Sequence, residues 1–165
     1  MNAKDAILNL YGFADRIVEK YLEGLSDADL LVRPVEGMNH MAWQLGHLIV
    51  SEHSLLNSVK PGASPLLPEG FEEAHGREPD STGSNDSQRF STKAHYLELL
   101  KVQREATKAV VAGMSSEDLD TPSIEKFRSR LPTFGAVLLL IGSHYIMHSG
   151  QWVAVRRKLG LPVAI

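Results

Sequence analysis

The chain has 165 residues, 43% of them hydrophobic, and no cysteine. This length and apolar content suit a single domain with one core, which we expect to span residues 1–165. The formal net charge of −3, with Lys and Arg dispersed along the chain, argues against a nucleic-acid partner, and the lack of cysteine excludes disulfides, thiolate metal ligands and a protein thiol nucleophile.

The first half of the chain predicts two helices. Residues 4–25 carry apolar side chains at spacings of three and four, the pattern of a helix with one buried face. A short turn over 26–30 follows, and a second helix is predicted over about 40–59, with Asn39 as its capping side chain. Within that helix Glu52 projects onto the apolar face, so we expect it to be buried beside a basic group.

The second half predicts two more helices and two polar connections. Residues 61–86 are rich in Pro, Gly, Ser and acidic residues, which is typical of a long surface loop. Apolar spacing predicts a third helix over about 87–113, and a polar connection over 115–130 leads to a fourth helix. The fourth helix opens at the Pro-Thr pair 132–133 and ends with the basic segment 156–158, in agreement with the charge preference of a helix C-terminus.

Four amphipathic segments without a strand candidate predict an all-α protein, in the form of a four-helix bundle. The connection between the second and third helices, about 25 residues long, can run the length of a bundle. We therefore expect an up-down-down-up order, with a long crossover loop between helices two and three.

Secretion and membrane insertion are not indicated. The N-terminal segment carries Asp5 and Asp15 within its apolar pattern and lacks the features of a signal peptide. The longest apolar run, 136–141, is far shorter than the roughly 20 residues that cross a bilayer. We expect a soluble, cytoplasmic protein without a membrane partner.

Two histidines of the fourth helix, His144 and His148, lie on its apolar seam. Positions four apart on a helix differ by about 40° in direction and one turn in height, so both imidazoles can reach one metal ion. The spacing is that of an HExxH metal helix, although Tyr145 stands where that motif has its general base. The alternative is that both are core histidines with local hydrogen-bond partners.

A third ligand has to come from the remaining histidines. His47 lies beside the main apolar face of the second helix, on a border where a side chain either lines a cleft or points to solvent. His40 is one heptad earlier and points nearly the same way. His75, in the polar loop, and His95, near the start of the third helix, are expected to be solvated.

Two segments together resemble the DinB/YfiT superfamily: Asn-His-Met-Ala-Trp-Gln-Leu-Gly-His-Leu over 39–48, and His-Tyr-Ile-Met-His-Ser-Gly-Gln over 144–151. The resemblance covers essentially the whole chain. In that family one histidine of helix two and a His-x-x-x-His pair of helix four bind a divalent ion, which implies His47, His144 and His148 as the ligands here. The family also suggests a homodimer.

Two further residues are candidates for a supporting role around this site. His40 is a possible additional contact, although the family pattern does not require it. Gln151 either orients a ligand or substrate or is an ordinary amide on the helix surface.

Three neutral imidazoles leave a Zn²⁺ ion at least one open position, as in catalytic zinc sites, and Ni²⁺ or Fe²⁺ suits the same ligands. Water at that position acquires a pKa of about 7 and serves hydrolysis, whereas a substrate thiol there becomes a thiolate. The resemblance implies both outcomes, namely hydrolases and S-transferases or isomerases of low-molecular-weight thiols. We expect a small-molecule substrate, with the metal-bound water or the substrate thiolate as the catalytic group.

A non-enzymatic function stays open. In this alternative the ion only adds folding energy to a dimerisation module, and Trp43, Val50 and Trp152 serve a protein interface. A fourth protein ligand closing the site would favour this function, whereas an ion facing a cleft would favour catalysis.

Overall fold

The computed structural model describes residues 1–76 and 89–164. Within these ranges the regular secondary structure is helical, apart from an isolated bridge between Pro122 and Thr133. The prediction of an all-α protein is therefore confirmed. None of the helices in the described part combines the length and the apolar character needed to cross a membrane.

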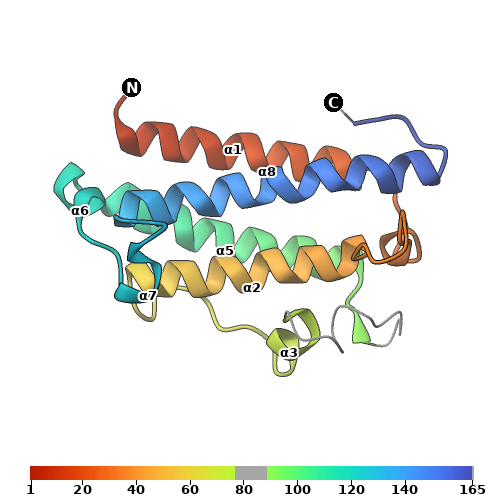
Figure 1. Cartoon of the computed structure of the whole chain (residues 1–165), viewed down its shortest axis with the longest axis horizontal. Coiled ribbons are helices and arrows are strands. Elements are labelled where there is room, and N and C mark those ends of the chain that lie inside the picture. The colour runs from red at the N-terminus through yellow and green to blue at the C-terminus, as the bar shows by residue number, and fades with distance from the viewer. Residues whose placement is uncertain (77–88, 165) are drawn as a thin grey trace.

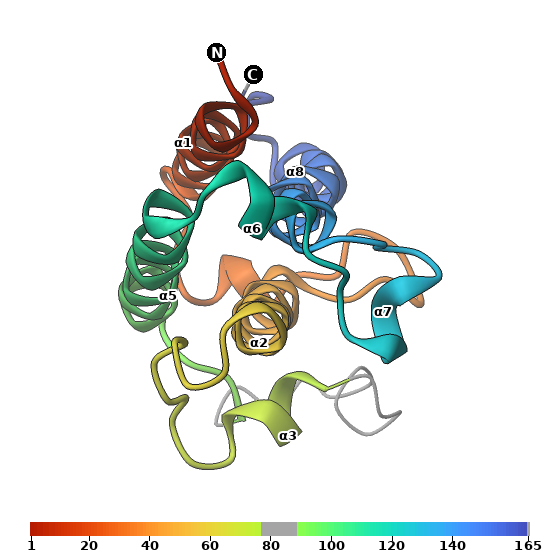
Figure 2. The same cartoon turned by 90° about the vertical axis from the view of Figure 1, so that its left-hand side faces the viewer.

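Four long helices make up most of the structure: α1 (Ala3–Leu22), α2 (Met41–Val59), α5 (Lys93–Gly113) and α8 (Phe134–Lys158). They lie alongside one another, as Figure 1 shows from the side and Figure 2 from one end. Both α1 and α2 pack on α5 and on α8, so each long helix has two long neighbours. Each of the four contributes side chains to both buried apolar clusters of the core.

Side-chain caps define where the first two long helices begin. Asn2 and Asp5 form a reciprocal capping box at the start of α1. The predicted cap of α2 is wrong, because His40 and not Asn39 is the N-cap residue. The Nδ1 atom of His40 accepts a hydrogen bond from the backbone N–H of Trp43 at 3.1 Å, which satisfies one of the donors left open at the helix start.

The starts of α5 and α8 also depend on threonine caps. α5 begins at Lys93, where the Thr92 hydroxyl accepts from the backbone N–H of His95. The predicted start near residue 87 is therefore too early, and residues 87–88 lie outside the described part of the chain. Thr133 caps α8 in the same way, in agreement with the prediction from the Pro-Thr pair.

Both polar connections contain short helices that the sequence did not predict. α3 (Phe71–His75) lies within the predicted surface loop, of which residues 77–86 fall outside the described ranges. α6 (Ser116–Asp120) and α7 (Glu125–Arg128) lie in the connection between α5 and α8. A single 3-10 turn, η1 (Asp29–Leu31), follows α1 where a turn was predicted.

A buried ionic cluster interrupts the apolar core where the four long helices meet. Arg104 on α5 is 3% exposed and pairs with Glu52 on α2 at 3.3 Å and with Asp15 on α1 at 2.9 Å. Its guanidinium lies between the rings of Tyr11 and Tyr145, 4.5 and 4.6 Å from their centroids. Burial raises the pKa of Tyr145 well above its ordinary value, so this phenol stays neutral. The predicted pairing of Glu52 with a basic group is confirmed.

Candidate metal centre

The side chains of His47 on α2 and of His144 and His148 on α8 converge between these two helices. One ring nitrogen of each lies within 4.8 Å of those of the other two. The Nε2 atoms of His144 and His148 are 3.1 Å apart. The ring centroid of His47 lies 5.3 Å from that of His144 and 5.4 Å from that of His148. Among the described residues, these three have ligand atoms close enough to share a metal ion.

The spacing of the nitrogens fits a shared ion. Two nitrogens that each lie about 2.05 Å from a Zn²⁺ ion are about 3.3 Å apart when the nitrogen–metal–nitrogen angle is tetrahedral. They are about 2.9 Å apart when that angle is a right angle. The 3.1 Å between the two Nε2 atoms on α8 falls between these values. Imidazole nitrogens also suit Zn, Ni and Fe, so both the spacing and the chemistry of the donors are compatible with metal binding.

Stacking against Trp43 orients the imidazole of His47. The two rings are one helical turn apart on α2, nearly parallel at 7°, with centroids 4.8 Å apart. His47 and His148 are 6% and 8% exposed, whereas His144 is partly exposed. The cluster is therefore largely shielded from water, with His144 on its more open side.

Gln44 on α2 fixes the tautomer of His148. The indole N–H of Trp152, which can only donate, donates to the Gln44 Oε1 at 2.9 Å, and the Gln44 Nε2 donates to the Asn39 carbonyl at 2.8 Å. The oxygen of Gln44 thus faces the His148 Nδ1 at 3.1 Å, so this nitrogen carries the proton. The Nε2 of His148 is then unprotonated, which is the state that a metal ion requires.

The two residues predicted as possible supporting groups lie apart from this contact. His40 is fully buried and caps α2, while Gln151 is exposed on α8. Their supporting roles stay predictions, whereas Gln44 is the side chain that contacts His148. Gln44 lies three residues before His47 on the same polar stripe of α2, and this periodicity is the signal in the sequence that could have identified it.

The structure corrects the expectation for His75, which is buried and not solvated. Its Nδ1 contacts the Phe71 carbonyl at 2.8 Å, and its Nε2 contacts the Tyr96 hydroxyl at 2.7 Å. Burial lowers the pKa of His75 from 6.5 to about 4. Gly46 makes room for the ring, because a Cβ at this position would lie 2.0 Å from the Cδ2 of His75. The residue next to His47 therefore sets how closely α3 approaches α2.

A cleft of about 850 Å³ adjoins the three histidines. His47 and His144 line it, whereas His148 is on the far side of the cluster against Gln44. The other lining side chains come from α2, α8, the end of α3 and the segment 126–131. An ion held by the three histidines would therefore lie beside this cleft.

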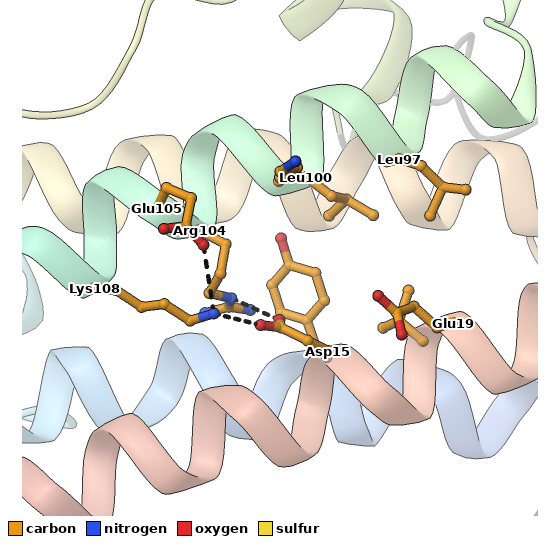
Figure 3. A pocket seen from close by; sticks show the side chains of 10 residues that line it. Asp15, Glu19, Leu97, Leu100, Arg104, Glu105 and Lys108 are labelled. Carbon is orange, nitrogen blue, oxygen red and sulfur yellow. Dashed lines mark hydrogen bonds and ion pairs between the residues drawn. The ribbon is translucent and has the colours of Figure 1, made fainter.

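A second cleft, of about 440 Å³, lies between α1 and α5 (Figure 3). Asp15 bridges Arg104 and Lys108 there, at 2.9 Å from each. The two clefts have no lining residue in common, so the second one is separate from the candidate metal centre.

Comparisons with known proteins give a family and a fold. A model of the DinB superfamily matches residues 12–152. The crystal structure of a conserved protein from Enterococcus faecalis superposes with a TM-score of 0.75, covering 97% of this chain and 99% of that chain at 18% sequence identity. At this identity the likeness shows the fold alone. No curated protein matches the chain.

Proposed function

The chain belongs to the DinB superfamily, and we propose that it is a metal-dependent enzyme whose divalent ion is bound by His47, His144 and His148. The convergence of three ring nitrogens within 4.8 Å of one another carries this proposal. Zn²⁺ or Ni²⁺ is the ion we propose, and Fe²⁺ is compatible with the same donors. When bound, the ion would supply Lewis-acid activation, either of water for hydrolysis or of a substrate thiol for transfer.

We propose the thiol reaction, which is transfer or isomerisation of a low-molecular-weight thiol. Besides histidines, the polar side chains that line the described part of the cleft are serines and cations: Ser51, Ser54, Ser129, Lys126 and Arg130. A substrate thiol needs no base on the protein, because coordination itself deprotonates it. Hydrolysis usually relies on a side chain that moves protons, most often a histidine or a carboxylate. The described lining has no carboxylate, and both ring nitrogens of His75 are already hydrogen-bonded. The described lining therefore suits a thiol substrate better.

Three side chains outside the proposed ligand set prepare the site. Trp43 keeps the plane of the His47 ring by stacking on it. Gln44 keeps the proton of His148 on Nδ1, and Trp152 in turn orients the Gln44 amide. These contacts hold the His47 ring in place and leave the Nε2 of His148 unprotonated and facing His144 before any ion binds, which is the kind of support that orients metal ligands.

We also propose an up-down-down-up bundle and a homodimer. In Figure 1, α2 and α5 run opposite to α1 and α8, which supports this order with the segment between α2 and α5 as the crossover. The homodimer follows from the family resemblance. Light scattering on the purified protein tests it, since a dimer has twice the 18.2 kDa mass of the chain.

Metal analysis of the purified protein tests the ligand assignment. We expect one ion per chain in the wild type and a severe loss in His47→Ala and His144→Ala. His95→Ala is the matched control, because His95 is a partly exposed histidine on α5, outside the cluster. Undiminished metal in either cluster variant would defeat the assignment.

Calorimetric titration of the metal-loaded protein with small thiols tests the reaction class. Because a bound thiol should lose its proton, the measured heat should depend on the ionisation enthalpy of the buffer. Turnover of an ester or amide panel without a response to thiols would identify a hydrolase. A bound ion with neither response, in a protein that dimerises only when the ion is present, would favour a metal-stabilised dimerisation module.

A further inference from the structure

We propose that the cleft beside the three histidines binds a substrate with a carboxylate or a comparable anionic group, and that Lys126 and Arg130 bind this group. The inference rests on the proposed function and specifies its substrate class, namely a small organic anion with a thiol.

The charge of the cleft differs from that of the chain. The chain as a whole has 20 acidic and 17 basic residues. Among the described residues lining the cleft, however, the charged side chains apart from histidines are Lys126 and Arg130. A cleft lined by one sign of charge attracts ligands of the opposite sign, and a divalent ion on the histidines would add to this potential.

The second cleft provides an internal comparison. Its lining contains three acidic and three basic side chains, namely Asp15, Glu19, Glu105, Lys101, Arg104 and Lys108. All of them except Lys101 are labelled in Figure 3. There the carboxylates already neutralise the cations, as the contacts of Asp15 with Arg104 and Lys108 show. Among the described lining residues, the excess of positive charge is therefore found in the histidine cleft and not in the second one.

The segment that carries the two cations is fixed by its own hydrogen bonds. The Arg128 guanidinium donates twice to the Ser123 carbonyl, at 3.0 and 2.9 Å, and the Ser123 N–H donates to the Pro132 carbonyl at 3.0 Å. Ser123 itself is 1% exposed. The chain around α7 is thus closed into a defined wall opposite α2 and α8, so an anion would meet cations whose backbone is already in position.

The size and the apolar walls of the cleft set the rest of the ligand. Its volume of about 850 Å³ is toward the upper end of the range for small-molecule sites. Phe127 and Leu131 lie on the same segment as the cations, and Leu140 and Met147 lie on α8 near His144. A thiol on the ion and an anionic group near Lys126 would therefore be joined by a spacer with apolar surface.

Two thiols of the same length and nearly the same shape, one anionic and one neutral, test the inference: 3-mercaptopropionate and its amide, titrated into the metal-loaded protein. We expect the carboxylate to bind at least about tenfold more tightly, since a charge-assisted contact is worth about that factor. Lys126→Gln and Arg130→Gln should each reduce the preference by about three- to tenfold, and the double variant should abolish it. Lys101→Gln, which removes a cation of the second cleft, should leave the preference unchanged.

The inference would be overturned if the two thiols bound equally well, or if Lys101→Gln reduced the preference as much as Lys126→Gln and Arg130→Gln do. Either result would leave the proposed function intact. A second titration separates the two ideas further. Succinate added to the chelator-treated full chain should bind through Lys126 and Arg130 without any ion. If neither thiol binds the metal-loaded protein but succinate binds and requires both cations, the proposed thiol function fails and the anion site stands. If succinate also fails to bind, the anion site is overturned as well.

Discussion

Glu52 on α2 lies 3.3 Å from Arg104 on α5, and both side chains are buried between the long helices. The Thr107 hydroxyl donates to the same Glu52 oxygen at 2.7 Å. A buried ion pair gains little net stability over apolar residues of equal volume, but removal of one partner leaves an uncompensated charge in the core. We therefore expect the pair to constrain which helices can be neighbours more than it adds to stability.

Glu52→Leu should lower the free energy of unfolding by about 3–5 kcal/mol, because Arg104 would keep Asp15 as its one acidic partner. The double variant Glu52→Leu/Arg104→Met should be more stable than either single variant. Urea unfolding of the three proteins measures this coupling. Glu23→Gln is the control: it removes an exposed ion pair with Lys20 and should not shift the urea midpoint. If the losses of unfolding free energy in the two single variants simply add up in the double variant, the coupling between Glu52 and Arg104 is disproved.

Gln44→Met should weaken metal binding by about 10- to 100-fold, since it removes the acceptor that keeps the proton on the His148 Nδ1. A competition titration with a chromophoric chelator measures the affinity. Gln103→Met is the matched control, because Gln103 is an equally buried amide that bonds to Ser64 and Pro65, away from the histidines. Both variants should be less stable than the wild type, but only Gln44→Met should bind the metal ion more weakly. Equal metal affinities in the two variants would refute the role of Gln44.

Gly46→Ala should destabilise the protein by about 1–3 kcal/mol, because the added methyl group would overlap the His75 ring, which is bonded at both nitrogens. Gly150→Ala adds the same group to a helix with no neighbour within 4 Å, so it should be neutral or stabilise slightly. Thermal denaturation compares the two. If the two substitutions shift the midpoint alike, the close approach of His75 to α2 is wrong.

Acid should destabilise the fold through His75. Its pKa is about 4 in the folded protein and near 6.5 when unfolded, so between these values the unfolded chain binds more protons. The free energy of unfolding should therefore fall as the pH falls from 6.5 to 4, by up to about 3 kcal/mol from this residue. Urea unfolding at pH 7 and pH 4.5, with a chelator present, measures the change.

His75→Gln should flatten this pH dependence, because an amide does not titrate in this range. His95→Gln, on a partly exposed histidine, should leave it as in the wild type. An unchanged slope in His75→Gln would assign the acid sensitivity to other groups.

Apolar periodicity was enough to predict that the four long helices exist, because each of them presents several turns of one buried face to the core. The second helix was predicted over about 40–59 and is found at Met41–Val59. Helix α5 starts later than predicted, since Thr92 offers a cap that periodicity does not register. The helices α3, α6 and α7 have four or five residues each, too few for a period to appear.

The site was less accessible to such reasoning, since its contacts cross between helices. Helical projection left His47 undecided between cleft and solvent, because the answer depends on how α8 packs beside it. Gln44 was missed as a supporting residue because its partner Trp152 is 108 residues away in the sequence. His75 was placed in solvent because its loop is polar, whereas a glycine on α2 gives its ring a buried position.

The chain has two tryptophans, and both adjoin the histidine cluster. Trp43 stacks on His47, and Trp152 shares the Gln44 oxygen with His148. The tryptophan fluorescence of the chain thus originates beside the histidine cluster. If an ion binds at the three imidazoles as proposed, emission intensity and wavelength should report its arrival or departure in real time, without any attached dye.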